Sequence, residues 1–196
     1  VCIVPIVLTT VIILLSMFVT TVYFPGLDKY VQIICMIPYT IQGVILSVSI
    51  LAAYVKSDTF LSNRMVMLFG AYSIIIMPYT YQGIKNGMSS VNVNTLLEAA
   101  EMLGASRIFA FFRIVVPNIV SSVVVSSLLA VGIIFGDYVL VRNLTGTSFQ
   151  NMQIYLYQTM KSDSMKASAV FVVIMAITFM IAAVTLFLKN RGKHTK

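Results

Sequence analysis

The stretch SSVNVNTLLEAAEMLGASRIFAFFRIVVPNIVSSVVVSSLLAVGIIFGD, residues 89–137, joins a polar, helix-forming segment to a run of 23 residues without a charged side chain. That run, residues 114–136, exceeds the roughly 20 apolar residues that a helix needs to cross the hydrocarbon of a bilayer. We therefore expect the run to span a membrane, and we expect the polar segment before it to lie outside the bilayer.

The rest of the chain has the same apolar character. Of its 196 residues, 59% are hydrophobic and only 10% are charged, whereas a soluble domain carries about a quarter charged residues. Four further runs lack charge, at residues 1–27, 30–55, 65–84 and 167–188. The sequence thus predicts one all-α membrane domain over residues 1–196 with about five spanning helices.

The basic residues predict how the domain is oriented. The formal net charge is +7, and the Lys and Arg residues lie between the apolar runs and in the tail KNRGKHTK, residues 189–196. This distribution is typical of positive-inside anchoring in a cell membrane rather than of nucleic-acid binding. We expect a cytoplasmic C-terminus, a cytoplasmic segment 85–113 and an external segment 139–166. The tail can also contact anionic lipid.

A short cytoplasmic helix is expected within residues 85–113. Asn94 and Thr95 can cap a helix that continues to Leu103, because their side chains accept hydrogen bonds from the first free amides. Gly104 is suited to end that helix in the left-handed conformation.

A spaced pattern runs through the same segment and consists of Glu98-Ala99-Ala100, Gly104, Ile114 and Val116-Pro117. This pattern resembles the EAA signature of ABC importer permeases of type I. The spacing agrees throughout, and the one departure is Val116 in the place of a leucine.

The resemblance implies a coupling role for Glu98, Ala99, Ala100, Gly104, Ile114 and Pro117. It implies that the short helix docks on a separate ATP-binding cassette subunit, which carries the ATP and Mg, so that this chain needs no cofactor. A second permease subunit, the same or different, and an extracytoplasmic substrate-binding protein are the other implied partners. Such permeases have a six-helix core, and the chain begins at Val1, so we expect it to be N-terminally incomplete and to lack the first helix.

Residue chemistry fits such docking. Small residues allow close approach of a partner surface: Ala99, Ala100 and Gly104. Acids can pair with basic groups of that partner: Glu98 and Glu101. Apolar residues are expected to hold the helix to the membrane body: Leu96, Leu97, Met102 and Leu103.

Shorter patterns resemble the polyamine-permease branch of the family. They are Met36-Ile37-Pro38, Met77-Pro78-Tyr79, Phe135-Gly136-Asp137-Tyr138 and the stretch MQIYLY at residues 152–157. Related branches carry 2-aminoethylphosphonate, ferric iron or sugars, so the resemblance implies a small polar or cationic solute.

Asp137 is the candidate for contact with that solute. If the fourth span is one continuous helix, Asp137 shares a face with Ser122, Ser126 and Ala130. Small residues at this spacing favour close helix packing, so the face is expected to meet a partner permease subunit, with Asp137 in the shared solute pathway. The alternative is that Asp137 lies at the outer interface and meets water or Arg142.

The sequence contains no pattern for catalysis or metal binding. It has no phosphate-binding loop, its single histidine is His194, and Cys2 and Cys35 lie in apolar runs. We therefore predict no enzyme activity and no metal site in this chain. Two other classes stay open at this point: a secondary transporter driven by an ion gradient, which needs several polar residues in broken helices, and a non-transporting membrane scaffold.

Overall fold

The computed structural model describes residues 2–41, 43–54, 62–146 and 149–194, and every regular element within these ranges is helical. Four long helices are α1 (Ile3–Val22), α4 (Arg64–Ser90), α7 (Val116–Phe135) and α10 (Ser164–His194). The shorter helices are α2 (Asp28–Thr40), α3 (Gly43–Tyr54), α5 (Val93–Met102), α6 (Arg107–Ala110), α8 (Val139–Thr145) and α9 (Met152–Ser162), with a 3-10 turn η1 (Pro25–Leu27) and a π-helical turn η3 (Phe111–Val115). The all-α prediction is confirmed.

Fewer helices than the expected five are both long and apolar enough to cross a membrane. Among the described residues these are Ile3–Val22, Arg107–Phe135 and Ser164–Phe187, and a fourth span results if α2 and α3 are one broken span. The helix missing from this set is α4, although it has 27 residues. Its second half carries Tyr, Gln, Lys and Asn side chains, which lower its hydropathy.

The predicted span over residues 30–55 is bent. Its two helices, α2 and α3, cross at 99°. Pro38 lies inside α2, two residues before its end, and Ile41 then has an extended backbone with φ −91° and ψ 114°. Proline has no amide hydrogen for the helical ladder, so the last turn of α2 is weakened at the point where the chain changes direction.

Pro117 has a different effect at the start of α7. The segment Arg107–Phe135 forms one helix of 29 residues, but it contains the wider turn η3, in which the Val116 amide donates to the Phe111 carbonyl. Pro117 has no amide hydrogen to donate, and the neighbouring Asn118 side chain donates to the Ile114 carbonyl at 2.8 Å. The π-helical turn thus lets the proline enter the helix without breaking it.

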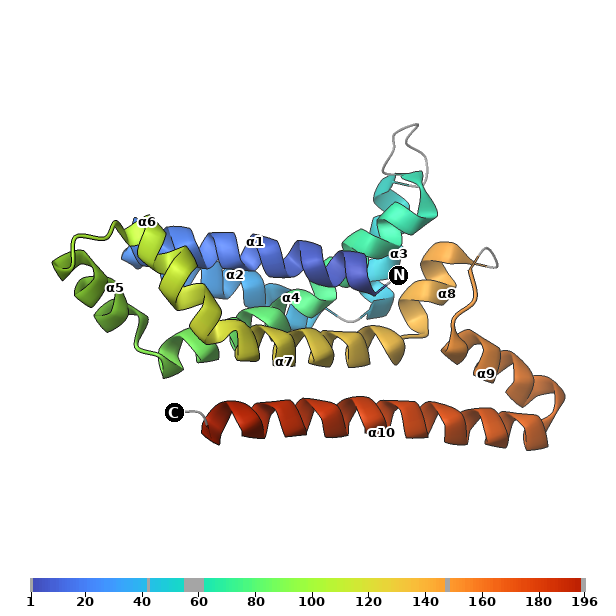
Figure 1. Ribbon diagram of the computed structural model, residues 1–196. Helices are drawn as coiled ribbons and strands as arrows, with labels where there is room; N and C mark the ends of the chain where they lie inside the picture. The colour runs from blue at the N-terminus through green and yellow to red at the C-terminus, as the bar shows by residue number, and fades with distance from the viewer. Residues whose placement is uncertain (1, 42, 55–61, 147–148, 195–196) are drawn as a thin grey trace.

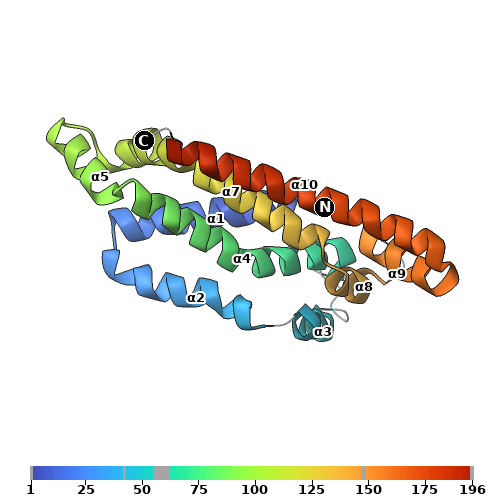
Figure 2. The same ribbon diagram turned by 90° about the horizontal axis from the view of Figure 1, so that it is seen from below.

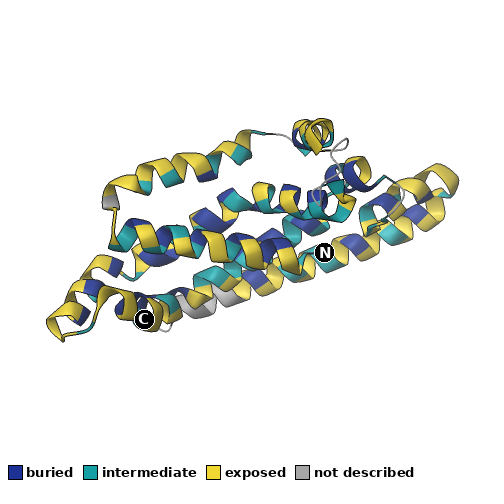
Figure 3. Cartoon of the chain, turned by 90° about the horizontal axis from the view of Figure 1, so that it is seen from above, coloured by how far each residue is buried: buried dark blue, intermediate teal, exposed yellow. Residues whose placement is uncertain are grey.

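The two ends of the bundle are distinct. Helices α5 and α6 lie at the same end as the C-terminus, whereas α3, α8 and α9 lie at the other end, near the N-terminus (Figure 1). Helix α10 packs on α7 and α9 and leaves most of its surface exposed (Figure 3). The predicted cytoplasmic segment and the C-terminus therefore share one side of the domain.

Helix α4 lies at the centre of the bundle, in contact with α1, α2 and α7 (Figure 2). Its contact with α7 is close because two glycines face two serines. A Cβ on Gly83 would overlap Ser126 Oγ and lie 2.8 Å from Ser126 Cβ, and a Cβ on Gly87 would lie 2.6 Å from both Ser122 Cβ and Oγ. The small-residue face of α7 therefore packs within this chain, and the expectation that it meets a partner subunit is wrong.

This contact predicts the effect of adding one methyl group to α4. Gly83→Ala should destabilise the fold by about 1–3 kcal/mol, because the added carbon overpacks the contact with Ser126. The matched control is Gly132→Ala on α7, where a Cβ has no neighbour within 4 Å and the change favours the helix by about 1 kcal/mol. Thermal unfolding in detergent should separate the two variants, and Ser126→Gly should restore part of the loss in Gly83→Ala. Equal melting temperatures of the two single variants would contradict the packing argument.

Candidate functional site

Helix α5, the expected coupling helix, begins at Val93, two residues earlier in the chain than the first predicted cap indicated. Its N-cap is Asn92, in the left-handed conformation with φ 49° and ψ 62°, and no side chain caps it. Asn94 and Thr95, the predicted caps, lie inside the first turn. The reason is that Val93 is buried, so the apolar contact of the first turn determines where the helix starts.

The end of α5 is as predicted. Gly104 has a φ of +82°, its amide donates to the Glu101 carbonyl at 2.9 Å, and the Ala105 amide donates to the Ala100 carbonyl at 2.9 Å. These two bonds form a Schellman motif, which favours glycine at this position because a side chain strains the left-handed backbone. The motif fixes the direction in which the chain leaves α5.

The inner face of α5 packs against the helical bundle of the chain, here called the membrane body. Val93, Leu97 and Ala100 recur at helical spacing and are buried, in one cluster with Phe111 and Val115. Leu97 thus anchors the helix as expected. Ala100, predicted to face a partner, is instead part of this core.

The outer face and the tip of α5 are open. Met102 is 90% exposed and Leu103 is 89% exposed, so the prediction that they hold the helix to the body is wrong. Met102 lies opposite to the buried stripe because of the helical period, and Leu103 follows the last helical residue beside the glycine turn. Glu98, Ala99 and Gly104 are exposed with them, and a Cβ on Gly104 would meet no atom within 4 Å.

Glu101 is engaged within the chain. Arg107 of α6 donates to it twice, from Nε at 2.5 Å and from Nη2 at 3.1 Å. The hydrogen bond from Arg107 lowers the pKa of the Glu101 carboxyl. Because the pKa of Glu101 is lowered, the ion pair stabilises the fold above the ordinary titration range of a glutamate. This stabilisation is lost as the pH falls through the lowered pKa, so the pair is intact at neutral pH. Glu98 is therefore the acid left for a partner.

The other two residues of the spaced pattern shape the helix behind α5. Ile114 is half-buried within η3 and packs on the cluster that holds α5, whereas Pro117 is exposed in the first turn of α7. Neither residue reaches the outer face of α5. Both act on the path of the chain from α6 into α7.

Asp137 lies beyond the end of α7, which stops at Phe135. Its carboxylate accepts from the Tyr72 hydroxyl at 3.1 Å and from the amides of Leu140 and Val141 at 3.5 and 3.3 Å, at the start of α8. The Asn151 side chain donates to its backbone carbonyl at 2.6 Å. The expected continuous helix through Asp137 is thus wrong, because Gly136 ends α7 and Asp137 lies two residues before the start of α8 at Val139.

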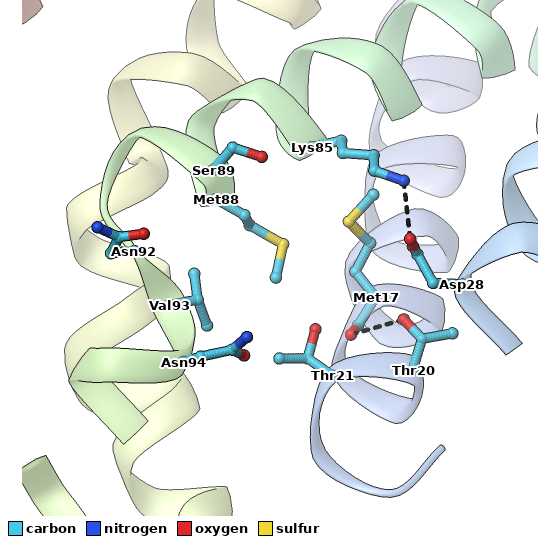
Figure 4. A pocket seen from close by; sticks show the side chains of 10 residues that line it. All are labelled: Met17, Thr20, Thr21, Asp28, Lys85, Met88, Ser89, Asn92, Val93 and Asn94. Carbon is cyan, nitrogen blue, oxygen red and sulfur yellow. Dashed lines mark hydrogen bonds and ion pairs between the residues drawn. The ribbon is translucent and has the colours of Figure 1, made fainter. Parts of the chain in front are cut away.

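A polar cavity of about 460 Å³ lies between the membrane body and the start of α5. Its lining comes from α1, the start of α2, the end of α4 and the first residues of α5: Met17, Thr20, Thr21, Asp28, Lys85, Met88, Ser89, Asn92, Val93 and Asn94 (Figure 4). Lys85 Nζ and Asp28 Oδ2 form an ion pair at 2.9 Å in the lining of this cavity.

One comparison decides the family. Residues 3–190 match the family model described as "Binding-protein-dependent transport system inner membrane component". The chain belongs to this family. No curated protein matches the chain by sequence.

The permease is therefore a membrane-spanning subunit of a binding-protein-dependent ABC transporter, and not its ATPase. Such a system includes ATPase and substrate-binding partners. Its multi-pass membrane location agrees with the apolar helices. Among the described residues, no group of three or more His, Cys, Asp or Glu side chains is arranged to hold a metal.

Some features of the permease escaped prediction from sequence. The pairing of Glu101 with Arg107 spans a glycine turn, and the hydrogen bond of Tyr72 with Asp137 joins residues 65 positions apart. The sequence gives a weak signal for the Glu101–Arg107 pair, since opposite charges flank the predicted turn at Gly104. It gives no signal for the Tyr72–Asp137 hydrogen bond, because only the packing of α4 on α7 and α8 brings the two side chains together.

The position of Asp137 predicts different effects for two substitutions. Asp137→Ala should lower the stability of the permease by about 1–2 kcal/mol, since it removes the acceptor for the first amides of α8. Asp137→Asn keeps one such acceptor and should cost much less. Thermal unfolding of the two variants in detergent measures the difference, and equal losses would show that the charge rather than the cap stabilises this corner.

Proposed function

We propose that the permease is part of an importer for a small polar or cationic solute, such as a polyamine or 2-aminoethylphosphonate, and that α5 couples it to the ATPase subunit. The observation that carries the coupling proposal is the exposed apolar tip of α5, Met102 and Leu103, beside the spaced pattern. Glu98, Ala99 and Gly104 are the other members of the proposed docking surface.

The tip has the chemistry of a docking element. It extends from the end of the bundle (Figure 1), where nearly complete exposure of two large apolar side chains is unfavourable unless a partner covers them. Full burial of one such side chain contributes about 1.5–3 kcal/mol. The open space around Gly104 lets a partner approach the backbone, and Glu98 is available to a basic group.

A displacement of α5 can be transmitted to the membrane helices through packed side chains. Leu97 and Ala100 pack on η3, and Arg107 ties α6 to Glu101. From Arg107 the chain continues as one helix to Phe135, and this helix is locked onto α4 by the glycine–serine contacts. Closure of two ATPase subunits would thus move α7 and α4 together with α5, switching the pathway between its two open sides.

The orientation follows from the same proposal. ATP and Mg bind to the partner ATPase in the cytoplasm, so the α5 end of the bundle is cytoplasmic. The C-terminus lies at that end (Figure 1) and is cytoplasmic too. The opposite end, with α8 and α9, faces the extracytoplasmic binding protein, and a second permease subunit completes the pathway.

A substitution at the tip tests coupling. Leu103→Asn in the assembled transporter should weaken retention of the ATPase subunit by roughly one to two decades in affinity, because a buried leucine contributes that much to an interface. The matched control is Met165→Asn in the first turn of α10, an apolar residue that is 86% exposed at the opposite end. Co-purification of the ATPase subunit and solute uptake are the measurements.

Glu98→Lys provides a second variant, which reverses charge without changing the apolar tip. It should also reduce retention of the ATPase subunit. If both Leu103→Asn and Glu98→Lys retain it as well as Met165→Asn does, α5 is not the docking element.

The substrate part of the proposal rests on the short sequence patterns and on Asp137. Asp137→Asn keeps an acceptor for α8 and removes the charge, so it isolates the electrostatic contribution. If an amine-bearing solute contacts this carboxylate, its uptake should fall by roughly one to two decades, the effect of one charge-assisted hydrogen bond of about 1.5–3 kcal/mol. Assembly with the ATPase should be unchanged. Normal uptake of a polyamine by Asp137→Asn would leave Asp137 with its capping role alone.

A further inference from the structure

One face of α4 is polar and uncovered. We call Tyr79, Gln82, Asn86 and Ser89 the polar strip. All four residues are exposed, Tyr79 to 38%. At 100° per residue they fall within an arc of about 80°, so they form one continuous line along the second half of the helix.

Neighbouring helices pack on both sides of the strip. Gly83 and Gly87 contact α7 on one side of the strip, and Lys85 bonds to Asp28 of α2 on the other. Figure 2 shows α4 between these two helices. Tyr79 also contacts the ring of Tyr39 in α2, with centroids 5.9 Å apart. The strip is therefore an open part of the second half of α4, between α2 and α7.

Lipid hydrocarbon is an unfavourable environment for this polar face. Primary amides in hydrocarbon cost several kcal/mol each unless their hydrogen bonds are satisfied. Within the described part of the chain, the amides of Gln82 and Asn86 bond to each other in one long contact of 3.5 Å, although each has two donors and two acceptor lone pairs. Helix α4 is also not among the described helices that are apolar enough to span a membrane alone.

The strip leads into the polar cavity beside α5. Ser89 belongs to both, and Lys85 lines the cavity next to the strip. Lys85 Nζ donates to Asp28 at 2.9 Å and to Gln32 and Tyr81 at 3.1 Å each, so its charge is balanced at the point where the strip ends (Figure 4). Polar groups thus continue without interruption from the middle of α4 to the α5 end of the bundle.

We infer that the polar strip is a wall of a water-filled solute pathway, and that solute leaves through the cavity beside α5. This inference rests on the proposed transport function and names the surface that performs it. The second permease subunit would close the side of the pathway that faces the strip.

The chemistry of the strip specifies how a solute is held. Amides and hydroxyls offer neutral hydrogen bonds in both directions, and several weak sites in a row allow a solute to enter and to leave. The four residues of the strip carry no charge, and the Lys85–Asp28 ion pair has a net charge of zero. The matching solute is a polar molecule recognised by hydrogen bonds along its length.

Thiol accessibility in the assembled transporter tests the inference. Gln82→Cys and Asn86→Cys are made in a chain with Cys2 and Cys35 replaced by serine and alanine, and are treated in membrane vesicles with a charged methanethiosulfonate reagent. The matched control is Ile34→Cys in α2, where an apolar residue is 59% exposed and lies two positions from Gln32, which contacts Lys85. The strip cysteines should react at least about tenfold faster, because the reactive thiolate forms poorly in apolar surroundings.

The outcomes are separable from those of the coupling experiment. Fast labelling of both strip cysteines, with a slow Ile34→Cys, supports the pathway wall. Labelling as slow as that of Ile34→Cys, in a complex that still retains its ATPase subunit, would show that protein or lipid covers the strip and would overturn the inference while leaving coupling intact. If either strip variant fails to assemble, Ser89→Cys reports on the same face with the smallest change in volume.

Discussion

The close contact between α4 and α7 is the constraint on which the rest of the bundle depends. It is made where glycine on one helix meets serine on the other, so the backbones approach to a distance that no larger pair permits. Without a hydrophobic driving force between helices in lipid, such packing is a main source of association. Because α7 continues back to α6 without a break, the same contact also positions α5.

This constraint gives α4 two different faces. One side is fixed against α7 and α1, and the other carries amides and a phenol that neither neighbour covers. A helix in lipid can keep such groups only where water or another protein chain meets them. The separation of a packing face from a polar face thus follows from where the glycines lie, at Gly83 and Gly87, relative to Gln82 and Asn86.

Helix α5 combines a firm attachment with an open tip. Its buried stripe and the Glu101–Arg107 pair hold it to α6 and η3, and the glycine turn exposes Met102 and Leu103. The proposed coupling to an ATPase subunit needs both properties, since a loosely attached helix would move without displacing the membrane helices. The π-helical turn before Pro117 keeps the connection to α7 continuous at the position where a proline would otherwise break it.

The sequence by itself determined the all-α membrane class, the glycine end of α5 and, through the spaced pattern, the family. These follow from composition, from local backbone preference and from spacing along the chain. It did not determine where α5 starts, where Met102 and Leu103 point, or that Ser122 and Ser126 pack within the chain. Those depend on which faces meet in three dimensions, and an amphipathic pattern does not say which neighbour covers a face. Asp137 shows the same limit, because its hydrogen bond to Tyr72 exists only once α4 lies beside α7 and α8.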